Sequence, residues 1–328
     1  MTTTKYYNEI TLLKGFAILF ITWFHFKWSV PEALSPLFIG GSIGNSIFFF
    51  CSGYLLSFKS ERCKGQWLLY KYFRIIPSVW VTLGIIMLCS FFRTGVFFDF
   101  PLMEWFWPNQ FWFVKAILIY FLVSYVSFEI FITFHKGERK IRKSWILAMI
   151  ALALIAHLLY YLLCVEKGLF VMDDSGVQCW FYWYIFFLLG CYLKNWGGQF
   201  SYSKLSFFES VLSIALFFGY KELASRYSVL TYMQFIAIPL LLFYIVYSLK
   251  NLSNYLLFIH LPNPIKNSFV FLADITLEVY LVQYYFITWL MPIIPFPINI
   301  GICLVVIFVM AYITHIIASR ISTLRFLL

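Results

Sequence analysis

Charged residues are scarce in this sequence: only 12% of its 328 residues are Asp, Glu, Lys or Arg, whereas 62% are hydrophobic and 23% are aromatic. A water-soluble domain usually carries about a quarter charged residues. So few charges cannot cover a globular surface, which excludes soluble enzymes, coiled coils, collagen and disordered chains. Together with a mean hydropathy of +0.85, the composition predicts an all-α polytopic membrane protein.

Metal-binding and redox motifs are missing as well. The seven cysteines are scattered and include no C-x-x-C pair, so no metal site and no redox motif is expected. Cys164 and Cys179 flank one predicted outer loop, where a disulfide and two unpaired thiols both remain open. No long hydrophilic insert and no repeat of fixed period divides the chain, so residues 1–328 are predicted to form one membrane domain.

The apolar runs predict ten membrane spans. A helix needs about 20 apolar residues to cross the hydrocarbon core. When the runs are broken at charge clusters, proline and glycine, the predicted spans cover 10–29, 37–58, 75–93, 110–133, 144–163, 179–196, 206–220, 229–249, 268–291 and 299–319.

The net charge of +10 is interpreted as a topology signal. With a cytoplasmic N-terminus, the predicted inner segments hold 17 Lys and Arg residues and the outer segments hold 5. Because positive residues collect on the cytoplasmic side, both termini are predicted to be cytoplasmic. The basic run at 135–143 then favours anchoring near anionic membrane lipid, and no nucleic-acid partner is expected.

The first predicted span carries two ionisable residues, Lys14 and His25, eleven residues apart. Eleven residues turn a helix by about 1100°, roughly three full turns, and rise about 16 Å. Both side chains therefore point to one face, with Lys14 near the cytoplasmic end and His25 deeper. One interpretation is that Lys14 is a cation that binds an anionic donor, and that His25, deeper in the membrane, is a base. The other is that Lys14 snorkels to the headgroups and His25 is a core histidine.

Three further segments follow in order. Residues 48–55 read FFFCSGYL, residues 71–77 read KYFRIIP, and residues 276–283 read TLEVYLVQ. With the Lys14–His25 spacing, this order resembles the acyltransferase-3 family of integral membrane acyltransferases, the polysaccharide O-acetyltransferase and intercellular adhesion protein C type. The sequence departs from the family pattern in having Lys14 where Arg is usual, Ser46 where Asp is common, and Gln283 where a late histidine often lies. No acid partner for His25 is therefore identified.

The resemblance implies an O-acyltransferase of the plasma or inner membrane. It would move an acyl group, most simply acetyl, from cytoplasmic acyl-CoA to a hydroxyl of a cell-surface or exported glycan, with no permanently bound cofactor. It also implies that His25 is the catalytic base. The residues implied to bind substrate or donor are Lys14, Lys71, Arg74, Ser52 and Trp112.

Each of these assignments has an alternative. Lys71 and Arg74 also suit inner-face anchoring, Ser52 suits small-residue helix packing beside Gly53, and Trp112 suits interfacial anchoring. A transporter or flippase for a glycan or acyl-bearing intermediate is the alternative function. It would use Lys14 and His25 as substrate contacts or as a proton relay.

Other ionisable residues are given structural roles. Asp274 and Glu278 lie at the start of the ninth predicted span, where they favour capping that helix over lining a cavity mouth. His157 and His315 have no acidic, basic or cysteine residue three or four positions away, so core packing is predicted for both.

Overall fold

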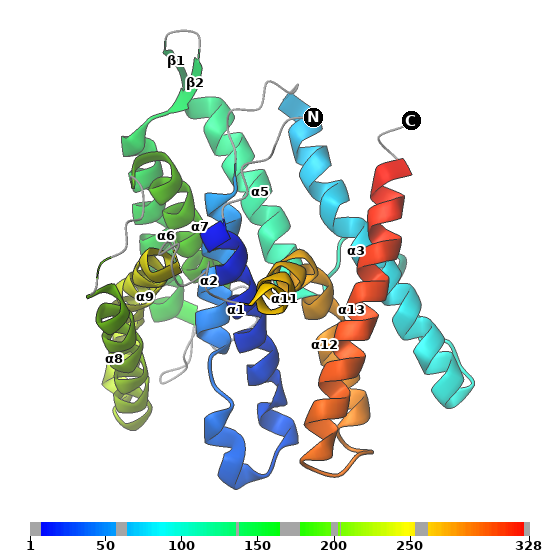
Figure 1. The fold of residues 1–328 in the computed structure, drawn as a ribbon. Helices are drawn as coiled ribbons and strands as arrows, with labels where there is room; N and C mark the ends of the chain where they lie inside the picture. The colour runs from blue at the N-terminus through cyan, green and yellow to red at the C-terminus, as the bar shows by residue number, and fades with distance from the viewer. Residues whose placement is uncertain are drawn as a thin grey trace. The chain divides into compact units, whose positions relative to one another are not determined.

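The computed structural model describes residues 8–56, 64–135, 138–164, 178–197, 203, 205–252 and 262–324. Within these ranges the chain is helical apart from short connections and one hairpin (Figure 1). The helices are α1 (Asn8–His25), η1 (Phe26–Ser29), η2 (Glu32–Leu37), α2 (Gly41–Tyr54), α3 (Lys64–Thr94), α4 (Leu102–Phe106), α5 (Trp112–Phe131), α6 (Lys143–Cys164), α7 (Gln178–Trp196), α8 (Ser206–Arg226), η4 (Ser228–Ile236), α9 (Ala237–Leu252), α11 (Asn263–Asp274), α12 (Thr276–Leu290) and α13 (Ile298–Leu324).

The hairpin was not predicted. Its strands β1 (Ile132–His135) and β2 (Glu138–Ile141) pair antiparallel, with Ile132 opposite Ile141 and His135 opposite Glu138. It occupies most of the basic run that was assigned to an inner loop. The side chains of both strands lie outside the described part of the chain, so the lipid-anchoring interpretation stays a prediction.

Every one of the ten predicted ranges contains helix, which confirms the helical fold class. Among the described residues, five helices are long and apolar enough to cross a membrane, or six if a broken pair counts as one span. The other four ranges hold helices that are shorter or less apolar. Ten spans and two cytoplasmic termini therefore stay predictions. The five helices are Glu9–Ser29, Gln66–Thr94, Lys143–Leu163, Val229–Leu252 and Ile298–Thr323.

The predicted start of the third span is wrong. The span was predicted to begin at residue 75, which left Lys71 and Arg74 in the loop before it, but α3 already begins at Lys64 and continues through Pro77. Its 31 residues make a helix of about 46 Å, longer than the hydrocarbon core of about 30 Å. The charged first turns of α3 can therefore remain helical without lying in hydrocarbon.

The ninth predicted span, 268–291, is not one helix. It divides at Ile275, whose φ of −94° and ψ of 13° are not helical, into α11 and α12. No side chain caps α12 at this point. The break follows Asp274, and it frees the first turn of α12 to place Glu278 independently of α11.

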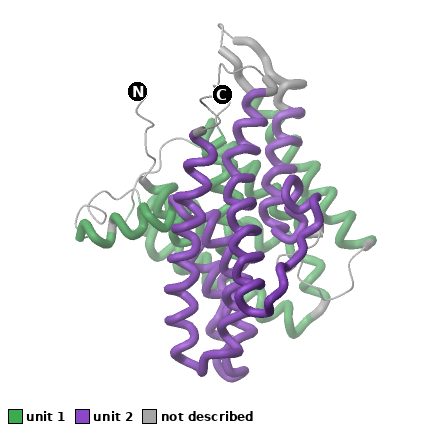
Figure 2. Tube along the Cα trace, turned by 90° about the vertical axis from the view of Figure 1, so that its right-hand side faces the viewer, with its two compact units in different colours: residues 1–17, 42–59, 128–273 green, residues 18–41, 60–127, 274–328 purple. Residues whose placement is uncertain are grey.

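The chain forms two compact units, each built from separate stretches of sequence (Figure 2). Unit 1 comprises residues 1–17, 42–59 and 128–273, and unit 2 comprises residues 18–41, 60–127 and 274–328. Helix α1 contributes its first half to unit 1 and its second half to unit 2. The single predicted domain is not tested by this division.

Unit 1 is closely packed around aromatic side chains. Phe49 of α2 stacks on Trp183 of α7, with ring centroids 6.0 Å apart. The two helices approach through glycine: a Cβ on Gly53 would lie 1.8 Å from the Phe187 carbonyl oxygen, and one on Gly190 would lie 2.1 Å from the Phe50 carbonyl oxygen. Only glycine permits this contact, which is how small residues bring membrane helices together. In the same unit, α6 packs on α7 and α8 packs on α9.

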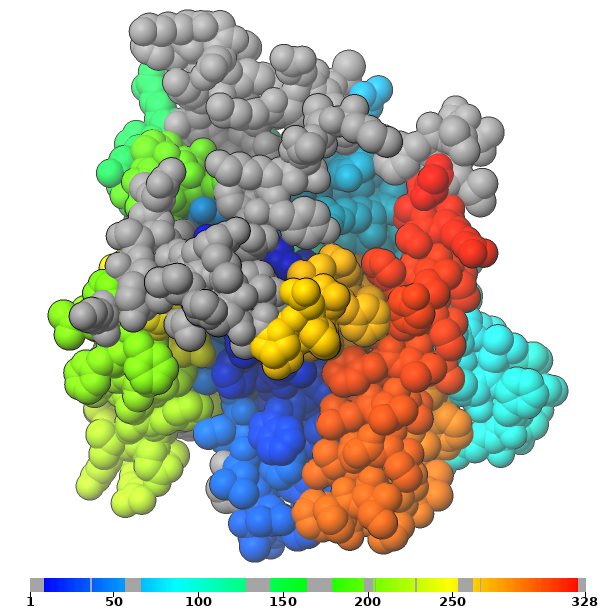
Figure 3. Space-filling view, in the orientation of Figure 1, coloured from blue at the N-terminus to red at the C-terminus, as the bar shows by residue number. Residues whose placement is uncertain are grey.

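In unit 2, α3, α12 and α13 pack on one another and lie side by side (Figure 1). The inner side chains of α13 recur with helical spacing and are fully or almost fully buried: Cys303, Ile307, Ala311, Thr314 and Ala318. Its outer face, orange to red in Figure 3, presents large apolar side chains, which suits contact with lipid: Ile302, Val305, Val309, Ile313 and Ile317.

Candidate functional site in unit 2

His25 is the last residue of α1 and is only partly exposed. Its ring packs near two aromatic rings, with centroids 6.0 Å from Phe24 and 6.2 Å from Tyr284 of α12. The Nδ1 atom is buried and has no hydrogen-bond partner among the described residues. A buried polar atom without a partner is costly and calls for an explanation. One ring nitrogen of His25 is thus available for a group that binds here.

A second unused polar atom lies on α12. The hydroxyl of Thr22, three residues before His25, donates a 2.7 Å hydrogen bond to Gln283 Oε1. Gln283 is fully buried, and its Nε2 has no partner among the described residues. The Thr22 bond fixes the amide, so the amide N–H groups keep one orientation.

These contacts place α1 and α12 in one small polar region of unit 2. Thr22 and His25 lie about one turn apart on α1, and Gln283 and Tyr284 are neighbours on α12. A neutral imidazole can accept a proton, and an amide N–H can donate a hydrogen bond to an oxygen. The region therefore offers a proton acceptor and a hydrogen-bond donor. Both are required when a hydroxyl attacks a carbonyl group.

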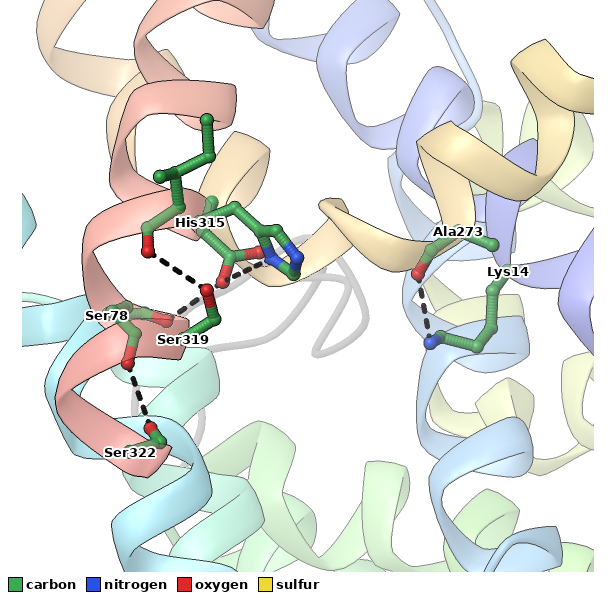
Figure 4. Close-up of polar contacts among 9 residues, drawn as sticks. Lys14, Ser78, Ala273, His315, Ser319 and Ser322 are labelled. Carbon is green, nitrogen blue, oxygen red and sulfur yellow. Dashed lines mark hydrogen bonds and ion pairs between the residues drawn. The ribbon is translucent and has the colours of Figure 1, made fainter. Parts of the chain in front are cut away.

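Lys14 belongs to unit 1 and is already engaged. Its ammonium donates a 3.1 Å hydrogen bond to the carbonyl oxygen of Ala273, the penultimate residue of α11 (Figure 4). Carbonyls at a helix C-terminus lack an intrahelical donor and attract cations. Lys14 and His25 remain eleven residues apart on one continuous helix, but they lie in different compact units.

Lys71 and Arg74 lie about one turn apart on α3, in unit 2. The Lys71 ammonium is positioned over the rings of Trp67 and Phe121, 5.6 and 5.3 Å from their centroids. This is a cation–π arrangement. Arg74 is exposed. The same helix thus carries one partly buried cation, Lys71, and one exposed cation, Arg74.

The contacts described for Ser52 and Trp112 are with residues of their own helices. The Ser52 hydroxyl donates to the Phe48 carbonyl of its own helix at 2.9 Å, and the adjacent Gly53 forms the contact with α7. Trp112 begins α5 and lies edge-on to Phe113 with centroids 5.9 Å apart. Substrate roles for these two residues stay predictions. The side chain of Cys164 lies outside the described part of the chain, as does any disulfide with Cys179.

The sequence interpretation missed a polar cluster formed by three helices of unit 2. Glu278 Oε1 of α12 accepts a 2.8 Å hydrogen bond from Ser78 of α3 and lies 3.4 Å from Nδ1 of His315 of α13 (Figure 4). Only 6% of the Glu278 side chain is exposed, against 36% of His315. Glu278 Oε2 is buried without a partner among the described residues.

Two structural predictions are therefore wrong. Glu278 does not cap α12, because its side chain turns to α3 and α13. His315 is not a packing residue alone, because it faces that carboxylate. Partners were sought at helical spacing on the same helix, but the partner of His315 is 37 residues away on another helix. The available signal was a carboxylate in an apolar span, since such a charge needs a partner.

Residues 40–44 also match G-x-S-x-G, the pattern of the nucleophile elbow in α/β-hydrolases. In that fold the serine follows a strand and is exposed. Here Ser42 follows the η2 segment, lies in the first turn of α2 and is 6% exposed. The surrounding structure required for a hydrolase nucleophile is absent at this serine.

Comparison with known proteins agrees with the sequence resemblance. The acyltransferase-3 family model, described as an acyltransferase domain, matches residues 7–319. The match includes both halves of α1 and all of α3 and α12. Neither the curated proteins nor the solved structures provide a match to the chain.

Proposed function

The chain belongs to the acyltransferase-3 family, and from this premise we propose that it transfers an acyl group, most simply acetyl, from cytoplasmic acyl-CoA to a hydroxyl of a cell-surface or exported glycan. Family membership and the long apolar helices identify a membrane acyltransferase. The donor, the acceptor, the O-linkage and the plasma or inner membrane as its location are what the proposal adds.

The observation that carries the proposal is that the unused ring nitrogen of His25 lies in the same polar region of unit 2 as the unused amide nitrogen of Gln283. A hydroxyl is a weak nucleophile until a base accepts its proton. An imidazole without a charged partner is neutral in an apolar region, so it has a lone pair for that proton. In the proposed reaction His25 takes the proton as the hydroxyl oxygen attacks the acyl carbon.

Gln283 supports the same step. As the carbonyl carbon becomes tetrahedral, negative charge develops on its oxygen, and fixed N–H donors stabilise that charge. The Gln283 amide is buried, is fixed by Thr22 and has an unused Nε2. We assign it to the developing oxyanion.

The phosphates of acyl-CoA require cations. Lys71 and Arg74 provide them on the N-terminal part of α3, which holds three of the four basic residues of the helix. Phosphate oxygens form strong charge-assisted hydrogen bonds with Arg and Lys. Lys14, which the family resemblance also implies as a donor contact, belongs to unit 1 and donates to the Ala273 carbonyl oxygen, and its role stays a prediction.

The proposal is tested by mass spectrometry of the surface polysaccharide from cells that produce the chain and from cells that lack it. Ester-linked acyl groups on the glycan are expected only in the producing cells. His25→Ala should reduce them by at least about 100-fold, because general-base catalysis contributes about 10²–10⁴ in rate.

His157→Ala is the matched control. His157 is also a histidine in an apolar helix, and its buried Nδ1 likewise has no hydrogen-bond partner among the described residues, but it lies in unit 1 against the rings of Tyr161 and Tyr182. It should leave acylation per folded protein unchanged, with membrane levels measured by immunoblot. Normal acylation in His25→Ala at equal protein level would contradict the catalytic assignment, and identical glycans with and without the chain would contradict the proposed function.

A further inference from the structure

The Ser78–Glu278–His315 cluster has the arrangement of an oriented acid–base residue. A buried carboxylate faces Nδ1 of an imidazole, a hydroxyl bonds the same carboxylate oxygen, and the imidazole is the most exposed member of the group. In catalytic triads the carboxylate holds Nδ1 in this way and leaves Nε2 to exchange a proton. None of these three residues has been assigned a role in the proposed reaction.

The cluster favours a protonated imidazole. Glu278 is almost fully buried, and one of its oxygens has no partner among the described residues. The Ser78 hydroxyl satisfies part of that charge but adds no positive charge of its own. An imidazolium at 3.4 Å supplies it, since an opposite charge nearby stabilises the charged form.

Helix α3 connects this cluster to the donor-binding cations. Lys71 and Ser78 are seven residues apart, about 700° or nearly two full turns, so they share one face of α3 with an axial separation of about 10 Å. Arg74 lies one turn before Ser78 on a neighbouring line of that face. A donor whose phosphates are held by Lys71 and Arg74 can extend along α3 toward His315.

On the basis of the proposed function, we infer that His315 is a second catalytic acid–base residue that protonates the thiolate leaving from acyl-CoA, and that Glu278 and Ser78 are its positioning residues. The two histidines then have opposite tasks. His25 has no acidic partner and accepts a proton, whereas His315 has one and donates a proton. Environments that separate two titratable groups in this way define the acid and the base of a reaction.

The hydroxyl oxygen forms a bond to the acyl carbon while its proton moves to His25. The C–S bond then breaks, its electron pair stays on sulfur, and the His315 imidazolium gives its proton to that sulfur. His25 returns its proton to solvent and His315 regains one from solvent. The net change is acyl-CoA plus alcohol to ester plus free thiol, with no oxidant or reductant.

The dependence on leaving group tests this role. The full chain is purified in detergent and given the host's surface polysaccharide as acceptor, with acetyl-CoA or 4-nitrophenyl thioacetate as donor. An alkyl thiolate is a much stronger base than a nitrophenyl thiolate, so its departure gains far more from a proton donor. His315→Asn should lose about 100-fold in rate with acetyl-CoA but less than about 3-fold with the aryl donor.

Glu278→Gln is the second variant, in case His315→Asn does not fold. It keeps the side-chain shape, removes the carboxylate, and should show the same donor selectivity with a loss of about 10-fold for acetyl-CoA. Asp274→Asn is the matched control, because it removes an equal charge one turn away, from a side chain that is exposed. It should change the transfer rates with both donors equally and by little.

The outcomes separate the two proposals. In one outcome the wild type is active, while His315→Asn and Glu278→Gln lower the rates with both donors equally, or lower neither rate. That result overturns the role of His315 and leaves the proposed function intact. A wild type that transfers from neither donor overturns the proposed function, and the role of His315 falls with it. Selective loss with acetyl-CoA supports both.

Discussion

His25 and His315 are two histidines on apolar helices of unit 2, yet their surroundings differ in one respect that decides their chemistry. Nδ1 of His25 is buried without a partner among the described residues. Nδ1 of His315 faces the Glu278 carboxylate at 3.4 Å. The first ring is free to bind an incoming group, and the second has a fixed orientation and a compensated charge.

The difference arises from α12. This helix places Gln283, which bonds Thr22, toward α1 and places Glu278 toward α3 and α13. Five residues separate Glu278 from Gln283, which is about 500° of rotation and about 7.5 Å along the axis. One helix thus supplies an amide to one histidine region and a carboxylate to the other.

The largest effect should come from removing the free imidazole. His25→Asn in the purified chain should lower ester formation by about 1000-fold, within the range for general-base catalysis. The loss should be equal for acetyl-CoA and 4-nitrophenyl thioacetate, because the acceptor hydroxyl is the same with either donor. Rates are measured by ester formation and by thiol release. A donor-selective loss would mean that the tasks of the two histidines are exchanged.

Gln283→Glu should have the next largest effect. The side chain keeps its size and its bond to Thr22 but loses the N–H donors. One oxyanion donor contributes about 10²–10³ in kcat, so kcat should fall by about 100-fold with little change in KM. A steady-state analysis with acetyl-CoA separates the two constants. A change in KM alone would show that Gln283 binds substrate and does not stabilise the transition state.

Thr22→Val tests whether the amide must be held in place. The substitution conserves the shape of Thr22 but removes the 2.7 Å bond to Gln283. A net hydrogen bond contributes about 0.5–1.5 kcal/mol, so the rate should fall by about 3- to 10-fold. In a Gln283→Glu background the further loss should be smaller. Additive losses in the double variant would indicate that Thr22 acts independently of Gln283.

Ser78→Ala should have the smallest effect. It removes one of the two donors to Glu278 Oε1 but leaves His315 in place. We expect a fall of about 3-fold with acetyl-CoA, as for the loss of one modest hydrogen bond, and no change with the aryl donor. Equal rates for wild type and Ser78→Ala with acetyl-CoA would show that the serine does not position the carboxylate.

Sequence patterns were sufficient for the fold class and for the family. Apolar runs locate helices because a membrane requires every backbone polar group to be bonded within a segment. The motifs of α1, α2 and α3 are local and depend on spacing along one helix, and the family model confirms the family that they indicated. The boundary of α3 failed because a charge cluster was treated as a loop, although a long helix can carry charges beyond the hydrocarbon core.

The His315 cluster could not be found by spacing. Its members come from α3, α12 and α13, and Ser78 and Glu278 are 200 residues apart. Contacts between helices depend on how the helices pack, and periodicity within each helix carries no information about it. The Thr22–Gln283 bond, across 261 residues, was missed for the same reason. Gln283 was noted only as a departure from the family pattern.

The most direct test of the account is one turnover of labelled acetyl-CoA by the purified full chain in sealed lipid vesicles with the surface polysaccharide as acceptor. The account predicts that label appears on the glycan as an alkali-labile ester and that one free thiol is released for each ester formed. If intact labelled donor or another intact acyl compound crosses the vesicle membrane and no ester forms, the chain is a transporter and the account is wrong.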